Sequence, residues 1–160
     1  MEIDALVCDH AEVADGKLFI NGAGITVSWV APQAPHVIGV ALAAVIHVPY
    51  TDTNEAHTLS VELVDEDHNV VAPWVPPGVE APGPVRVDTS FNVGRPPGLP
   101  VGETQLVPVA FGFHGLGLAA LGLYLFAISI DGNEIKRLPL LLAVPPQSPP
   151  AQFGPTSIPG

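Results

Sequence analysis

The sequence predicts an all-β fold: a single β-sandwich of about seven to ten mostly antiparallel strands, with Pro/Gly-rich loops and an extended C-terminal tail. Several segments alternate apolar and polar residues with a period of two. The 160 residues include 16 Gly and 19 Pro, which favours many short elements joined by turns. This length suits one domain with its own core. We assign residues 1–144 to the sandwich domain and residues 145–160 to a proline-rich tail.

The N-terminal segment is ambiguous from its pattern alone. The apolar residues in Ile3–Ala11 fit one face of a helix, and they also fit a strand. Asp15-Gly16, ahead of Lys17–Trp29, is a hairpin signal, because both residue types tolerate the left-handed conformation of a tight turn. We therefore expect strand structure on both sides of this turn.

Two later segments have the pattern of half-buried strands with one solvated face. His57–Asp65 and Val85–Val93 each place apolar residues at alternate positions. Asp131-Gly132 lies between two apolar runs and predicts a second hairpin. Asp65–Asn69 predicts a turn, because Asp and Asn favour turn conformations.

Two other predicted strands, Val37–Val48 and Gln105–Phe113, are apolar on both faces. A strand with two dry faces lies between layers or against another subunit, so we expect a homo-oligomer or a protein partner. On this view Ala43→Glu would dissociate the assembly without unfolding the sandwich. The interface candidates are the small residues of these faces and the two large apolar residues of the tail: Ala41, Ala43, Ala110, Gly112, Phe153 and Ile158.

Charge and hydropathy limit the classes of partner. Five Lys and Arg residues against sixteen Asp and Glu residues give a net charge of −11, which opposes binding to nucleic acid. The longest uninterrupted apolar run, Gly115–Ile128, is shorter than the roughly 20 residues of a spanning helix, so we expect no membrane span. One cysteine and an acidic N-terminus that does not resemble a signal peptide lead us to expect a cytoplasmic protein.

No catalytic motif is evident in the chain. Cys8 and His10 are a thiol and an imidazole close in sequence, but nearby acids such as Asp9 would raise the thiol pKa. We interpret Cys8 as a small core residue and Gly22-Ala23-Gly24 as a turn or bulge.

The six histidines are scattered and show no metal-ligand spacing. His47 and His57 flank the loop Pro49–Ala56, and their imidazoles could meet there if the flanking strands pair. The acidic turn Asp65–Asp67 offers too few oxygen ligands for a calcium loop. We therefore expect no metal and no cofactor.

Two tryptophans beside proline loops are candidates for a ligand platform. Trp29 and Trp74 could stack on a sugar or a proline-rich peptide, with His47 or His57 nearby, or they could cap the end of the core.

Three segments resemble a bacterial family of uncharacterised small proteins: Ala5–Thr26, His57–Val71 and Leu121–Val144. The pattern residues are Leu6, Cys8, Asp9, Ala11, Glu12, Gly16, Lys17, Leu18, Gly22, Gly24 and Ile25. The resemblance implies an all-β fold, with Ala5–Thr26 as a hairpin, and it implies no assigned activity. The chain departs from the family pattern at His68, where the turn usually carries Gly, and in its long tail.

These observations lead to three functional hypotheses. The first is a non-catalytic β-sandwich that acts through self-association or partner binding. The second is a small-molecule or carbohydrate-binding module that uses a loop end of the sandwich. The third is an enzyme whose scattered site no motif reveals.

Overall fold

The computed structural model describes residues 1–98 and 100–146, so the candidates Phe153 and Ile158 lie outside the described residues. Strands dominate the described part of the chain, and a three-residue 3₁₀ turn, η1 (Tyr50–Asp52), is the one helical element in it. The strands are β1 (Glu2–Cys8), β2 (His10–Ala14), β3 (Lys17–Asn21), β4 (Val27–Trp29), β5 (His36–Val48), β6 (Ala56–Asp65), β7 (Arg86–Asn92), β8 (Gln105–Leu118), β9 (Gly122–Ile130) and β10 (Asn133–Ala143).

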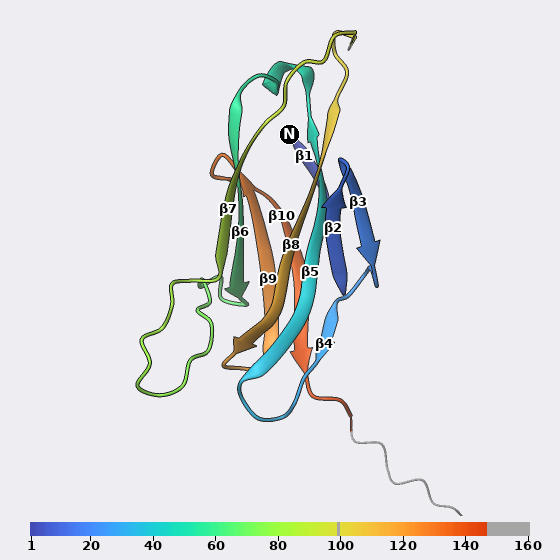
Figure 1. Cartoon of the computed structure of the whole chain (residues 1–160). Coiled ribbons are helices and arrows are strands. Elements are labelled where there is room, and N and C mark those ends of the chain that lie inside the picture. Colours follow the sequence, from blue (N-terminus) through green and yellow to red (C-terminus); the bar gives the residue numbers. More distant parts are fainter. Residues whose placement is uncertain (99, 147–160) are drawn as a thin grey trace, which may run out of the picture.

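The strands form two main sheets that face each other (Figure 1). One has three strands in the order β1-β5-β8, and the other has five in the order β4-β10-β9-β6-β7. Neighbouring strands are antiparallel except for β4 and β10, which run parallel. The predicted all-β sandwich is therefore confirmed. No helix among residues 1–98 and 100–146 is long and apolar enough to cross a membrane.

The core lies between the two sheets. Ile38 and Leu42 of β5 are buried in one cluster with Phe126 of β9 and Leu140 of β10. The rings of Phe113 and Phe126 meet across the sandwich, with their centroids 4.9 Å apart. Each fully buried side chain of this size contributes about 1.5–3 kcal/mol to folding, so this cluster is the main source of stability.

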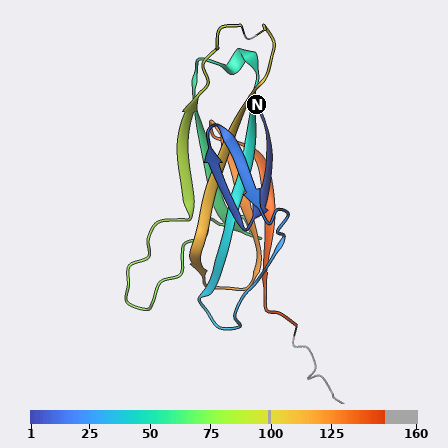
Figure 2. The same ribbon diagram turned by 45° about the vertical axis from the view of Figure 1, so that its right-hand side comes forward.

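A hairpin of β2 and β3 adds a third layer on the outer face of the three-stranded sheet, as Figure 2 shows. Its turn is Asp15-Gly16, with φ values of 49° and 68° that match a tight hairpin turn. Ala11 and Leu18 of the hairpin pack over a small cluster in the sheet below them. The predicted Asp15-Gly16 hairpin is confirmed, as is the Asp131-Gly132 hairpin between β9 and β10.

The N-terminal segment differs from the expected single hairpin over Ala5–Thr26. The chain breaks at Asp9, whose backbone N–H donates to the carbonyl oxygens of Asn21 and Gly22. Residues before the break pair with β5, and only residues after it form the hairpin. The strand interpretation of the N-terminus is correct, but the segment contributes to two layers: β1 joins the three-stranded sheet, and β2 and β3 form a separate hairpin layer.

The predicted turn at Asp65–Asn69 forms around one carboxylate. Oδ1 of Asp65 accepts hydrogen bonds from the backbone N–H groups of Asp67 and Asn69, at 3.0 and 2.8 Å. The bond from Asn69 is the main reason why the pKa of Asp65 lies below its ordinary value. His68 has a φ of 66°, a left-handed conformation that favours glycine. This conformation would account for the Gly that the resemblance implies at this position.

This geometry makes a prediction about His68. His68→Gly and His68→Ala both remove the imidazole and its hydrogen bond with Arg137, so they differ mainly in backbone strain. We expect the glycine variant to be more stable than the alanine variant by about 1 kcal/mol, because a Cβ is disfavoured at positive φ. Urea unfolding measures the difference. Equal stabilities would show that residue 68 does not hold this conformation in solution.

Candidate functional site

The small residues that were expected to form an oligomer interface have mixed positions. Ala41 and Ala43 are each 1% exposed, because the β2–β3 hairpin of the same chain covers them together with Cys8. Ala110 on β8 is half-buried, and Gly112 is exposed. This placement corrects the expectation that a second copy covers Ala41 and Ala43: the dry face of β5 is satisfied within the chain.

An apolar stripe, here called the outer stripe, crosses the outer face of the five-stranded sheet. It consists of Val27, Trp29, Leu123, Leu125, Pro139, Leu141 and Ala143. Leu141 pairs with both Val27 and Leu123, and Ala143 pairs with Trp29. Paired residues on neighbouring strands project from the same face, so these side chains lie side by side. Trp29 is 58% exposed, Leu141 40% and Leu123 37%. The stripe is therefore a continuous exposed apolar surface.

Charged residues on the same sheet are arranged as opposite pairs next to the outer stripe. Arg86 contacts Glu62 and Asp88, both at 2.7 Å. Arg137 contacts Glu134, also at 2.7 Å. Three of the five basic residues of the chain, Arg86, Lys136 and Arg137, lie on strands of this sheet. Arg137 offsets the charge of Glu134, and Arg86 offsets one of its two carboxylate neighbours.

The other tryptophan candidate does not join Trp29. Trp74 lies in the loop between β6 and β7, and its backbone N–H donates to the carbonyl oxygen of Gly117 on β8 at 2.8 Å. Trp29 ends β4, at the edge of the five-stranded sheet on the other side of the sandwich from this loop (Figure 1). The two indoles belong to separate surfaces, so they do not form a shared platform.

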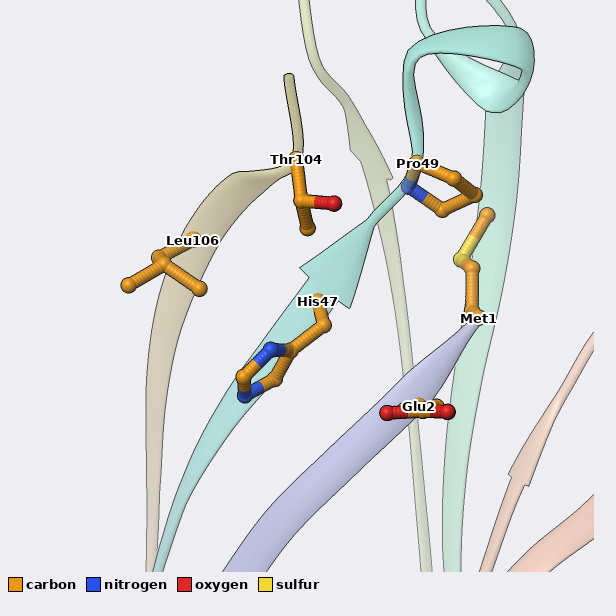
Figure 3. A pocket seen from close by; sticks show the side chains of 6 residues that line it. All are labelled: Met1, Glu2, His47, Pro49, Thr104 and Leu106. Atoms are coloured by element: carbon orange, nitrogen blue, oxygen red, sulfur yellow. The ribbon is translucent and has the colours of Figure 1, made fainter. Parts of the chain in front are cut away.

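His47 lines a shallow hollow of about 450 Å³ at one end of the three-stranded sheet (Figure 3). Met1, Glu2, Pro49, Thr104 and Leu106 complete its lining. The His47 ring is hydrogen-bonded to Oδ2 of Asp4 at 2.8 Å, and the Asp4 side chain is 80% exposed. An ion pair this exposed contributes little stability, and the mixed lining shows no preference for one ligand chemistry.

His57 lies apart from His47, because β5 and β6 belong to different sheets and do not pair. The imidazole of His57 is buried and tilts against the ring of Phe91. Nδ1 faces Oδ2 of Asp131, and Nε2 faces the carbonyl oxygen of Asp52, both at 2.8 Å. Both ring nitrogens therefore face acceptors, which only the doubly protonated imidazolium satisfies fully.

This environment shifts two pKa values in opposite directions. The hydrogen bond that His57 donates to the Asp131 carboxylate is the largest influence on the imidazole and raises its pKa, although burial of the ring opposes the effect. The pKa of Asp131 is lowered, mainly by the backbone N–H of Thr58 and then by His57. With both nitrogens occupied, His57 ties η1 to the β9–β10 turn and is not free to act as a general base.

Cys8 is a buried core residue whose thiol contacts backbone carbonyl oxygens. Its Sγ lies 3.4 Å from the carbonyl oxygen of His10 and 3.5 Å from that of Ala41. Burial, and secondarily the charge of Asp9, raise the pKa of the thiol. A thiol of raised pKa is a poor nucleophile at neutral pH, which agrees with the structural role expected from the sequence.

Comparison with known proteins places the chain in a family. The family of unknown function DUF6941 matches residues 3–143. The chain belongs to this family. No curated protein matches the chain, and no solved structure matches it. The resemblance inferred from the sequence motifs is thus confirmed at the level of an uncharacterised family, and the family leaves the function to be argued from the surface.

Sequence reasoning named Trp29 but missed the rest of the outer stripe. Leu123 and Leu141 stand in runs that are apolar throughout, so nothing in the local pattern separates the exposed leucines from the buried ones. Burial alternates along β10, where Leu138, Leu140 and Leu142 are buried and the residues between them are exposed, but residues 138–142 are all apolar, so this alternation is visible only in the structure. The parallel pairing of β4 with β10, which completes the stripe, has no local signal.

The covered position of Ala43 makes a prediction opposite to the one from sequence. Ala43→Glu places an unpaired carboxylate under the hairpin, so we expect the free energy of unfolding to fall by about 3 kcal/mol or more. Ala110→Glu is the matched control, because Ala110 pairs with Ala43 but is half-buried. We expect it to cost about 1 kcal/mol or less in the same urea titration. A fully stable Ala43→Glu variant would show that the hairpin does not cover this residue.

The raised pKa of His57 predicts a pH-dependent stability. Its contribution is fully present below the ordinary histidine pKa of about 6.5 and is lost as the pH rises through the raised value. The contribution of Asp131 is lost only in acid, below the ordinary aspartate value of about 3.9. We therefore expect the urea midpoint to fall as the pH is raised above about 6.5.

His57→Gln should flatten this pH profile, because glutamine does not titrate. His47→Gln is the control: it removes a half-buried histidine whose partner, Asp4, is exposed, and it should leave the slope unchanged. The same slope in wild type and His57→Gln would contradict the assignment.

Proposed function

We propose that this protein is a non-catalytic β-sandwich that acts by associating with a second copy of itself through the outer stripe. The outer stripe carries the proposal, because contiguous exposed apolar surfaces on soluble proteins mark interaction sites. The occupied nitrogens of His57 and the raised thiol pKa of Cys8 support a role other than catalysis. We also infer a cytoplasmic location, supported by a single buried cysteine.

The charge distribution favours a second copy as the partner. With a net charge of −11, two copies repel each other unless they meet where the charge is low. The outer stripe contains no charged residue, and the ion pairs of Arg86 and Arg137 lie beside it. A two-fold arrangement would bring the same uncharged surface of each copy together, as the common symmetric dimers do.

The size of the face sets the expected strength. The three strands that carry the outer stripe, β4, β9 and β10, lie about 4.8 Å apart and average about eight residues, which gives a surface of about 350 Å². This area is less than half of the roughly 800 Å² that each partner contributes to a standard stable interface. We therefore expect a reversible dimer with a dissociation constant in the micromolar range, strengthened by salt that screens the repulsion.

Leu141→Glu tests the proposal. A charge in the middle of the outer stripe should weaken self-association at least tenfold, measured by sedimentation equilibrium or light scattering between 1 and 200 µM, concentrations that span the expected range. Phe19→Glu is the matched control: it adds the same charge at an apolar residue that is 51% exposed, on the hairpin instead of the stripe. It should leave association within about twofold of wild type.

Two outcomes would overturn the proposal. One is a wild-type protein that stays monomeric at 200 µM in high salt. The other is equal weakening by Phe19→Glu and Leu141→Glu, which would show an effect of net charge alone.

A further inference from the structure

Two of the six histidines have rings without a hydrogen-bond partner in the described part of the chain. The rings of His36, His47, His57 and His68 each bond to a protein group. The other two, His10 and His114, instead face each other, with ring centroids 6.2 Å apart and planes inclined by 27°. Both residues are exposed, so their ring nitrogens are accessible from solvent.

The fold builds this pair from distant parts of the chain. His10 is the first residue of β2, in the hairpin layer, and His114 lies on β8, in the sheet beneath it. A bulge opposite Ile38 and Gly39 accompanies Gly115, whose φ is 76°. The His114 ring lies across Gly112: a Cβ there would be only 3.2 Å from Cδ2 of the ring. Gly112 thus leaves room for an imidazole next to the hairpin.

The two rings are close enough to reach a shared metal ion after a change of side-chain rotamer. Zinc binds imidazole nitrogen at about 2.0–2.1 Å, and that nitrogen lies about 1.1 Å from the ring centre, so two rings on one tetrahedral ion have centroids about 5.2 Å apart. From the observed 6.2 Å the centroids must move about 1 Å closer, and the nearly parallel rings must turn their nitrogens toward a common point, which rotations of two exposed side chains can supply. Imidazole is a preferred ligand of zinc, nickel and copper ions.

We propose that His10 and His114 together bind one divalent transition-metal ion, with water completing its coordination. The net charge of −11 favours this, because it raises the local concentration of cations. No group of three or more metal-ligating side chains occurs among residues 1–98 and 100–146, so this is a two-ligand site with exchangeable positions. The bound ion would join the hairpin to β8 and hold the hairpin over Cys8 and Ala41. The site is independent of the outer stripe.

The test uses the full chain, without an affinity tag, and nickel chloride or zinc chloride as the probe. Isothermal titration should show one ion per chain, and the ion should raise the thermal midpoint by about 2–4 °C or more, because a ligand that binds only the folded state stabilises it. His10→Ala and His114→Ala should each weaken binding at least tenfold and abolish the rise in midpoint. His47→Ala is the control, since it removes a half-buried histidine elsewhere on the sheet that carries His114, and it should bind as wild type does.

An NMR measurement on the wild-type protein keeps the test independent of how the variants fold. Substoichiometric paramagnetic nickel should broaden the imidazole signals of His10 and His114 before those of the other histidines. The proposal is overturned if the chain binds no ion at 1 mM, if either alanine variant binds as wild type does, or if His47→Ala loses binding equally. First broadening at another histidine would also overturn it.

Discussion

The architecture depends on one constraint, which is that β5 must be covered on both faces. Its inward side chains Ile38, Val40 and Leu42 are large and face the five-stranded sheet across the core. Its outward side chains Ala41 and Ala43 are small and equally buried. Large residues fill the gap of about 10 Å between packed sheets, whereas small ones let a hairpin approach closely. The large side chains on one face of β5 and the small side chains on the other therefore decide that the five-stranded sheet packs on the first face and the hairpin on the second.

The covering hairpin has consequences beyond burial. The break at Asp9 turns the chain out of the three-stranded sheet, and the turn at Asp15-Gly16 returns it across the same face. Because β2 begins immediately after the break, His10 is held beside β8, where it meets His114. The paired histidines thus follow from the same chain path that buries Cys8.

The sequence was sufficient to predict local strands and turns, but it was not sufficient to predict which segment covers the outer face of β5. Period-two alternation located β6 and β7, and Asp-Gly pairs located two hairpins, because these signals depend on neighbouring residues. The dry outer face predicted for Val37–Val48 was correctly recognised at Ala41 and Ala43 and was wrong at Val37 and Gly39, which are exposed. The segment that covers this face was not predicted, because a hairpin of the same chain and a second copy of the protein would both bury its small apolar residues. The outer stripe and the His10–His114 pair depend on long-range register and on a bulge, for which a single sequence carries no local signal.

The net negative charge of the protein has different consequences for the two outer faces of the sandwich. Like charge opposes the approach of a second copy, so association is favoured at the outer stripe, which carries no charged residue and lies beside acids that are paired with Arg86 and Arg137. The same negative charge attracts cations to any ligand free to bind them. The proposed ligands, His10 and His114, lie with the hairpin layer on the opposite side of the sandwich. An ion bound there would therefore leave the outer stripe free, so self-association and cation binding can occur on one molecule at the same time.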